Sequence, residues 1–309
     1  MRNTARSIAA FAGGVAVLGA CSSNGLSSTP AMDAASASHR QLAARLAGGS
    51  LKELAVVYDD DGTVIGVLND KYKKVMSIAD SGAYRVWIDS AGNFYSTIYT
   101  GGKSYAQEFD KTGKLLYTYS SSDIIVATDV TTDSKGNVVV ASGQPSDTDD
   151  VVEFPQGSNK PSVICSTGLV NSGVAFDNSG NLFVTGQEGG NGVIQEYKRG
   201  LSGCSGTALA VTVNYPQGIK VDKAGNLVVC DASSGVDIIP PPYKSISKKV
   251  TNKGQKDYNY AAVDQKSETL FTVDTGGSKL YVNAYPSGTL ETTLGMRNVS
   301  GVATYPFQK

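Results

Sequence analysis

One short phrase recurs along this chain at a nearly constant spacing, and it constrains the fold more than any other feature. At residues 174–184 it reads Val-Ala-Phe-Asp-Asn-Ser-Gly-Asn-Leu-Phe-Val, an apolar run, an Asp-x-x-Gly-Asn turn and a second apolar run. The turns of its four full copies begin at Asp89, Asp133, Asp177 and Asp222, so that the intervals are 44, 44 and 45 residues. A decayed fifth copy at 261–277 has lost the Gly-Asn pair. A period of this length with short strands is typical of a propeller.

The chemistry of the repeat predicts a hairpin. Apolar runs that flank a polar turn containing glycine are the usual signal for two antiparallel strands. The aspartate carboxylate can accept hydrogen bonds from backbone N–H groups inside the turn, and the glycine supplies a positive φ angle. We therefore interpret Asp-x-x-Gly-Asn as turn chemistry and not as a metal site.

A second strand–turn–strand phrase follows each copy, which makes four strands per unit, as in a propeller blade. The same second phrase also occurs at 63–79, preceded by a single strand at 54–58, so this first unit lacks its innermost strand. An orphan strand at 299–306 resembles the start of the other copies. We expect an all-β, six-bladed propeller over 51–309, in which the C-terminus supplies the innermost strand of the first blade. That closure removes free strand edges, which favour aggregation.

Composition agrees with this fold and excludes one class of partner. Charged residues make up only 18% of the 309 residues, whereas there are 35 glycines and 16 tyrosines. The net charge is −1. Without a basic stripe the chain lacks the lysines and arginines that bind phosphates, so we expect no nucleic-acid partner.

The N-terminus predicts export. Two arginines precede an apolar run of 13 residues from Ile8 to Ala20, which is shorter than the ~20 residues that span a bilayer. This is the pattern of a secretory signal. The segment that ends this run, residues 18–21, reads Leu-Gly-Ala-Cys and resembles the lipobox of bacterial lipoproteins. This resemblance implies a signal peptide at 1–20 and lipidation of Cys21. The alternative is an ordinary signal with a chance cysteine. Residues 21–50 are small and polar, as in a flexible tether.

The propeller region resembles the NHL-type and gluconolactonase-like six-bladed propellers. The Asp-x-x-Gly-Asn turns carry this resemblance, together with the Glu-Phe-Pro-x-Gly turn at 153–157 and the Tyr-Pro-x-Gly turn at 285–288. Members of these families include lactonases, amidating lyases and protein-binding scaffolds, so the fold alone does not specify a function.

The resemblance implies a ligand site at one mouth of the axial channel, at the end opposite the Asp-x-x-Gly-Asn turns. We predict that polar side chains from the innermost strands and wider loops gather there: Arg85, Asp129, Asn171, Gln217, Tyr260, Asp231 and Asp274. Trp87 and Lys220 share one column of the innermost strands. We assign Trp87 to the core, and Lys220 could reach the channel.

No catalytic constellation stands out. The single histidine, His39, lies in the tether, which excludes a Ser-His-Asp or Cys-His site within the propeller. Lactonase relatives hold a divalent metal on oxygen ligands, and Asp129, Asn171, Asp231 and Asp274 could supply these to Ca²⁺ or another divalent cation. The metal-binding glutamate of that family has no clear counterpart.

Three cysteines remain besides Cys21. Cys165 and Cys204 fall on the outer parts of consecutive blades, and an exported protein can keep disulfides, so we expect them to pair. Cys230 occupies a column of small residues and is expected to be a buried free thiol.

The sequence thus predicts a lipid-anchored, monomeric, exported propeller that acts as a non-catalytic binding or scaffold module. Its partner would be a protein or a glycan of the cell envelope, and it would contact the membrane only through its acyl anchor. In a bacterium with two membranes, Ser22 favours the outer one. The alternative is a metal-dependent, lactonase-like hydrolase. A glycan would stack on the loop tyrosines Tyr215, Tyr258 and Tyr260.

Overall fold

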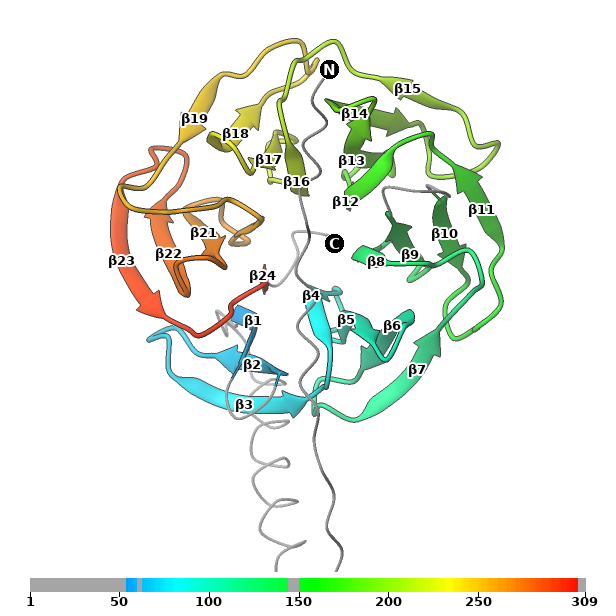
Figure 1. Ribbon diagram of the computed structural model, residues 1–309, viewed down its shortest axis with the longest axis horizontal. Coiled ribbons are helices and arrows are strands. Elements are labelled where there is room, and N and C mark those ends of the chain that lie inside the picture. The colour runs from blue at the N-terminus through cyan, green and yellow to red at the C-terminus, as the bar shows by residue number, and fades with distance from the viewer. Residues whose placement is uncertain (1–53, 60–62, 144–149, 305–309) are drawn as a thin grey trace, which may run out of the picture. The chain divides into compact units, whose positions relative to one another are not determined.

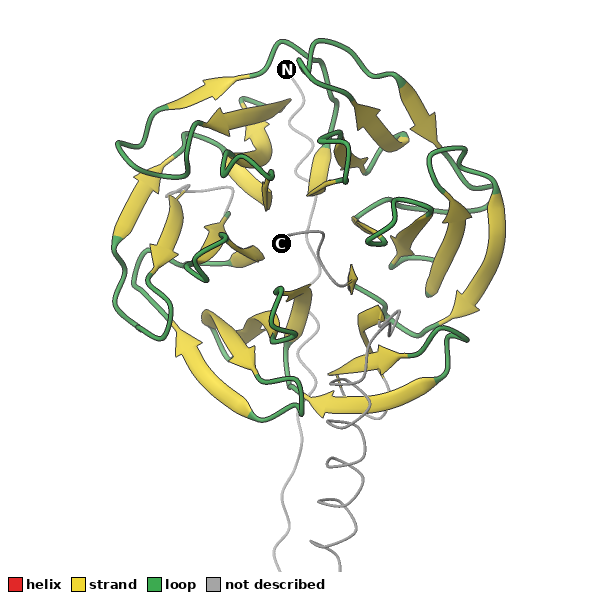
Figure 2. Cartoon of the chain, turned by 180° about the vertical axis from the view of Figure 1, so that it is seen from behind, coloured by secondary structure: helices red, strands yellow, loops and turns green. Residues whose placement is uncertain are grey.

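The computed structural model describes residues 54–304 except for 60–62 and 144–149. These residues form only strands and turns, arranged as six four-stranded antiparallel sheets in a ring (Figures 1 and 2). The expected all-β, six-bladed propeller is confirmed. No helix in this part of the chain is long and apolar enough to cross a membrane. The predicted lipidation site Cys21, the predicted signal peptide and the predicted tether lie outside the described residues.

Each blade takes its four strands in order from the axis outward. Blade 1 contains β24 (Gly301–Thr304), β1 (Leu54–Asp59), β2 (Thr63–Leu68) and β3 (Lys74–Ala79). Blade 2 contains β4 (Ala83–Ile88), β5 (Phe94–Thr100), β6 (Lys103–Phe109) and β7 (Leu115–Tyr119). Blade 3 contains β8 (Ala127–Thr132), β9 (Val138–Ser142), β10 (Asp150–Phe154) and β11 (Val163–Ser166).

The other three blades follow the same order. Blade 4 contains β12 (Val170–Phe176), β13 (Leu182–Glu188), β14 (Asn191–Tyr197) and β15 (Gly206–Ala208). Blade 5 contains β16 (Pro216–Val221), β17 (Leu227–Asp231), β18 (Gly235–Ile239) and β19 (Lys248–Val250). Blade 6 contains β20 (Tyr260–Val263), β21 (Thr269–Asp274), β22 (Lys279–Ala284) and β23 (Leu290–Gly295).

The ring closes between the two ends of the chain. Strand β24 pairs antiparallel with β1, from Leu54 opposite Thr304 to Val57 opposite Gly301. Figure 1 shows the red β24 beside the blue β1, which brings the first and last colours of the chain into one blade. The predicted C-terminal contribution to the first blade is therefore confirmed.

The Asp-x-x-Gly-Asn turns are built as their chemistry predicts. In blade 2 the Asp89 Oδ1 atom accepts hydrogen bonds from the backbone N–H groups of Ala91 and Asn93, at 2.9 and 2.8 Å. The Asn93 side chain donates to Oδ2 of the same aspartate, and Gly92 has a φ angle of 88°. The turns at Asp133, Asp177 and Asp222 repeat this arrangement. The repeated phrase is thus a structural device.

The hydrophobic core lies between the blades. Six clusters of buried apolar side chains alternate with the sheets, and each draws its members from two neighbouring blades. In one of them Val57 and Ile65 of blade 1 pack with Val86 and Ile88 of blade 2. Because each blade buries both faces in this way, the burial of apolar surface stabilises the ring as a whole.

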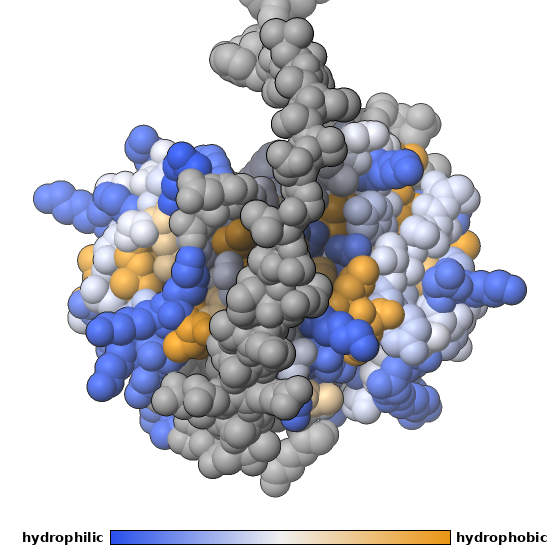
Figure 3. Space-filling view, turned by 90° about the horizontal axis from the view of Figure 1, so that it is seen from below, coloured by the Kyte–Doolittle hydropathy of each residue, from blue (hydrophilic) through white to orange (hydrophobic). Residues whose placement is uncertain are grey.

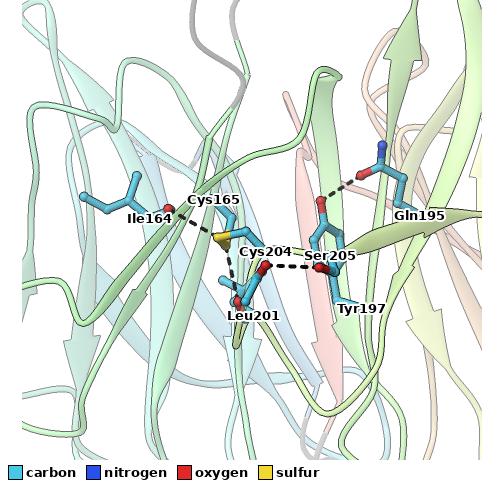
Figure 4. Close-up of a disulfide and its surroundings, with 8 residues drawn as sticks. Ile164, Cys165, Gln195, Tyr197, Leu201, Cys204 and Ser205 are labelled. Carbon is cyan, nitrogen blue, oxygen red and sulfur yellow. Dashed lines mark hydrogen bonds between the residues drawn. A yellow bond between two sulfur atoms is a disulfide. The ribbon is translucent and has the colours of Figure 1, made fainter.

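A disulfide joins two blades on the outside of the ring. Cys165 on β11 is bonded to Cys204, which lies in the loop before β15 (Figure 4). This is the pairing that the sequence predicts. Cys230 on β17 is buried and unpaired, and burial raises the pKa of its thiol to about 12. Since the thiolate is the reactive form, Cys230 is chemically inert at neutral pH.

Candidate functional site

Two layers of side chains fill the middle of the ring, where the six innermost strands face the axis. The first layer lies four residues before each turn aspartate, and it brings together Arg85, Asp129 and Tyr260 with glycines on the other three innermost strands. The second layer lies two residues later and contains Trp87, Thr131, Ala175, Lys220 and Ala262, with Ala303 from β24. Three of the seven predicted mouth residues therefore meet, but they meet inside the ring.

Arg85 is 1% exposed, which is unusual for an arginine. Its Nη1 atom donates to the carbonyl oxygen of Ser300, and its Nη2 atom donates to the Tyr84 hydroxyl at 3.0 Å. The guanidinium carbon lies 4.1 Å from the ring centre of Tyr84 and 4.7 Å from that of Tyr260. The two aromatic faces thus provide cation–π contacts for the buried charge.

Asp129 is the carboxylate at the centre of this layer and is fully buried. Its Oδ1 atom accepts hydrogen bonds from the backbone N–H of Val130, at 2.9 Å, and from the hydroxyl of Tyr260. Its Oδ2 atom accepts from the N–H of Val174, at 3.0 Å, and lies 3.8 Å from Lys220 Nζ. Asp129 therefore ties together four blades, and its oxygens are occupied by protein donors.

Lys220 reaches from the second layer into this network. Its Nζ atom lies 2.5 Å from the Tyr260 hydroxyl oxygen, 4.5 Å from the ring centre of Tyr260 and 5.0 Å from that of Trp87. Burial lowers the pKa of Lys220. The charge of Asp129 raises this pKa in part, whereas the charge of Arg85 lowers it further. Burial and the charge of Asp129 raise the pKa of Tyr260, so that Tyr260 stays a neutral hydroxyl.

Glycine makes room for these large side chains. A Cβ atom on Gly218 would lie 2.3 Å from Cδ2 of Tyr260, and one on Gly301 would lie 3.0 Å from the Cα of Arg85. Gly173 completes the set, because its Cβ would lie 2.6 Å from the carbonyl oxygen of Gln217. The layer thus combines three large or charged side chains with three glycines, a pattern visible in the sequence once the strands are aligned on the turn aspartates.

The remaining predicted mouth residues hold loops in place. Asn171 donates to the carbonyl oxygens of Ser142 and Asp150 and accepts from the Thr167 hydroxyl.

Asp231 accepts from the N–H groups of Asn214 and Ser233 and from the Ser233 hydroxyl. Asp274 accepts from the N–H groups of Lys256 and Gly277. The side chain of Gln217 is half-buried. The structure does not bring these four residues to Asp129, and the described residues contain no cluster of three or more metal-binding His, Cys, Asp or Glu side chains.

An open space on the axis lies at the end of the channel where the Asp-x-x-Gly-Asn turns are. A pit with a cavity volume of about 40 Å³ opens among the Asp-x-x-Gly-Asn turns, whereas the resemblance implied the opposite mouth. Its walls come from the second layer and from the ends of the innermost strands: Trp87, Ala175, Phe176, Asn178, Lys220, Val221, Asp222, Ala262, Val263, Ala303 and Thr304. The cause is the packing of the first layer, which fills the axis near the predicted mouth. The position of Trp87 in the pit wall shows that it is not solely a core residue.

Two of the three tyrosines that were expected to stack on a sugar are buried. Tyr258 is 7% exposed and Tyr260 is fully buried, so neither ring face can reach a ligand in solution. Tyr215 is exposed, and so are Tyr84 and Tyr99, which the stacking hypothesis did not include.

Asp80, in the turn between β3 and β4, links stability to pH. It is 8% exposed, its Oδ2 atom has no hydrogen-bond partner among the described residues, and burial raises its pKa to about 7. Because the folded state holds this proton more tightly than the unfolded chain, the stabilisation is complete below pH ~4 and is lost as the pH rises to about 7. We expect Asp80→Asn to match the wild type near pH 4 and to exceed its free energy of unfolding by at most about 4 kcal/mol at pH 8. Urea unfolding across this range measures the difference, and a difference that does not change with pH would contradict the assignment.

Comparisons with known proteins support the fold and leave the family open. No family model and no curated protein matches the sequence. A chain of the nidogen–laminin complex superposes with a TM-score of 0.68 at 16% identity, covering 84% of this chain and all of that one. A protein of unknown function from Bacteroides caccae gives 0.60 at 14% identity, over 82% of this chain and 98% of that one. TolB from Acinetobacter baumannii gives 0.65 at 11% identity, over 82% and 67%. At these identities the similarity establishes the fold alone, and membership of the NHL-type or gluconolactonase-like families stays a prediction.

Proposed function

We propose that this protein is a non-catalytic binding module, anchored to the cell envelope by lipid at Cys21, that binds a protein partner through blade 2. The observation that carries the proposal is the distribution of exposed apolar side chains. Nine large ones are exposed among the described residues, and five belong to blade 2: Tyr84, Tyr99, Leu115, Leu116 and Tyr117. Concentrated apolar surface on a soluble domain commonly marks a protein interface.

The outer strand of blade 2 is the centre of this surface. Strand β7 reads Leu-Leu-Tyr-Thr-Tyr, has no charged residue, and pairs only with β6 among the described strands. Val75 on β3 of blade 1 is exposed as well. Figure 3, which views the ring from the side of β3 and β7, shows apolar surface between the hydrophilic side chains. Natural edge strands are usually protected by charges, so an uncharged apolar edge suggests a partner that covers it.

Two further observations support a binding role over catalysis. The carboxylates proposed as metal ligands already accept hydrogen bonds from loops or from the axial network, so a lactonase-like site would have to displace those donors. In addition, the solved chain of the nidogen–laminin complex shows a propeller of this shape in a protein–protein assembly. A protein partner at the envelope fits these observations better than a glycan.

Site-specific photocrosslinking tests the proposal in cells that produce the full chain. A photoreactive phenylalanine analogue replaces Leu116 on β7 or, as the matched control, Leu290 on β23, and both positions are exposed side chains on outer strands. We expect one discrete product from position 116, recovered in the membrane fraction, and none from position 290. Leu115→Glu should abolish the product without changing stability by more than about 0.5 kcal/mol, because Leu115 lies on the surface.

The alternatives predict different results. Equal crosslinking from both positions, or none from position 116, would overturn the assignment of blade 2. Recovery of the product from the soluble fraction would overturn the lipid anchor and leave the interface standing, and Cys21→Ser should produce that result deliberately.

A further inference from the structure

The wall of the axial pit includes one lysine. Lys220 is the only basic residue in its wall, and its side chain is 8% exposed. The other axial positions of its layer that face the pit are alanines and Trp87. The second charged residue, Asp222, is already held by the N–H groups of its own turn and by the Tyr285 hydroxyl, 2.7 Å from its Oδ2 atom. The blade-2 interface does not include this pit, so the inference that follows is independent of the proposed function.

The surroundings of Lys220 favour its nucleophilic form. Burial and the nearby charge of Arg85 act in the same direction and lower its pKa, which increases the fraction of neutral amine at neutral pH. A lysine in a desolvated pocket beside another cation is one of the ways in which proteins activate an amine toward carbonyl compounds. Asp129, at 3.8 Å, opposes this effect only in part.

A route for protons leads away from the amine. Lys220 Nζ lies 2.5 Å from the Tyr260 hydroxyl oxygen, and that hydroxyl donates to Asp129 Oδ1. The amine, the hydroxyl and the carboxylate therefore form one hydrogen-bonded chain. Such a chain can accept a proton from the nitrogen and return it to a leaving oxygen, as general acid–base catalysis requires.

We propose that the axial pit is a carbonyl-binding site, in which the Lys220 amine forms a reversible imine with a small aldehyde or ketone. The nitrogen lone pair attacks the carbonyl carbon, and the carbonyl π electrons move to oxygen, which takes a proton. The nitrogen then forms the C=N bond as the hydroxyl leaves. Both amine hydrogens and the carbonyl oxygen depart as one water molecule, so no oxidant or reductant is needed. A cavity of about 40 Å³ admits only a small compound, whose apolar part would pack on Trp87 and the alanines.

Reductive trapping tests this directly. The full chain is incubated at pH 7 with acetaldehyde and sodium cyanoborohydride, and the alkylated lysines are identified by peptide mass spectrometry. We expect Lys220 to be modified faster than the exposed Lys223 three residues away, because the lowered pKa of Lys220 leaves more of its amine neutral at this pH. Lys220→Arg should remove that product alone, and Lys223→Arg should leave it unchanged. Tyr260→Phe should slow modification at position 220 only.

The wild-type labelling pattern is decisive, so the test holds even where a variant fails to fold. The preference for Lys220 should shrink as the pH approaches the ordinary lysine pKa of about 10.4, at which the exposed amines also become neutral. If the exposed lysines react while Lys220 stays unmodified, or if Lys220 reacts only in denaturant, the proposal is wrong.

Discussion

Asp129→Ala is expected to lower the free energy of unfolding by about 3–5 kcal/mol, because it leaves a buried cation and two backbone N–H groups without their acceptor. Asp129 is the only carboxylate within 4.0 Å of Lys220 Nζ among the described residues, and it accepts from Val130, Val174 and Tyr260. Equilibrium urea unfolding measures the loss. The same loss should follow at low and at high salt, since buried charges are little screened.

A double-mutant cycle separates the charge from the hydrogen bonds. Adding Lys220→Met to Asp129→Ala removes the unpaired cation with a side chain of similar length, so part of the stability should return. The losses in free energy of unfolding caused by Asp129→Ala and by Lys220→Met, added together, would then clearly exceed the loss measured for the double variant. Strict additivity would contradict the view that these groups act as one network.

Removing the disulfide is the second large effect that we expect. Cys165 and Cys204 are 39 residues apart in the sequence, and a crosslink closing a loop of that size restricts the unfolded chain enough to contribute about 3–4 kcal/mol. Cys165→Ala together with Cys204→Ala should reduce the free energy of unfolding by that amount. A reducing agent should destabilise the wild type and leave the double variant unchanged.

Cys230→Ala serves as the control for this prediction. Its thiol is buried and unpaired, so its replacement should show a loss that is the same with and without reducing agent. A double variant as stable as the wild type in oxidising buffer would show that the crosslink between blades 3 and 4 contributes nothing to folding.

The packing of side chains on the axis bears on both proposed sites, the blade-2 surface and the pit. Arg85, Asp129 and Tyr260 pack against one another in one buried layer, so their side chains fill the middle of the ring. The two proposed sites are therefore the outer surface of blade 2, which carries the most exposed large apolar side chains among the described residues, and the small pit lined by Lys220. The two sites lie on different parts of the molecule, and each can be tested without the other.

Much of the architecture follows from the sequence alone. The Asp-x-x-Gly-Asn turn is a local structure whose hydrogen bonds and positive φ angle involve residues within five positions of one another. Its repetition therefore reveals the number of blades, and the orphan strand at the C-terminus reveals how the ring closes. The pairing of Cys165 with Cys204 followed from the same alignment of repeats.

The interior of the ring was decided only by tertiary structure. Asn171 and Asp231 are polar residues near inner strands in the same way as Asp129. Asn171, however, binds two backbone carbonyl groups of blade 3 and Asp231 binds the turn that follows it, whereas Asp129 contacts three other blades. Irregular pairing in β4, β8, β12 and β16 shifts which residue faces the axis, and a sequence pattern does not record those shifts. Whether a channel is open or filled depends on the joint volume of side chains from six strands far apart in the sequence. Periodicity specifies where each strand lies, but the space left between the strands is a property of their packing.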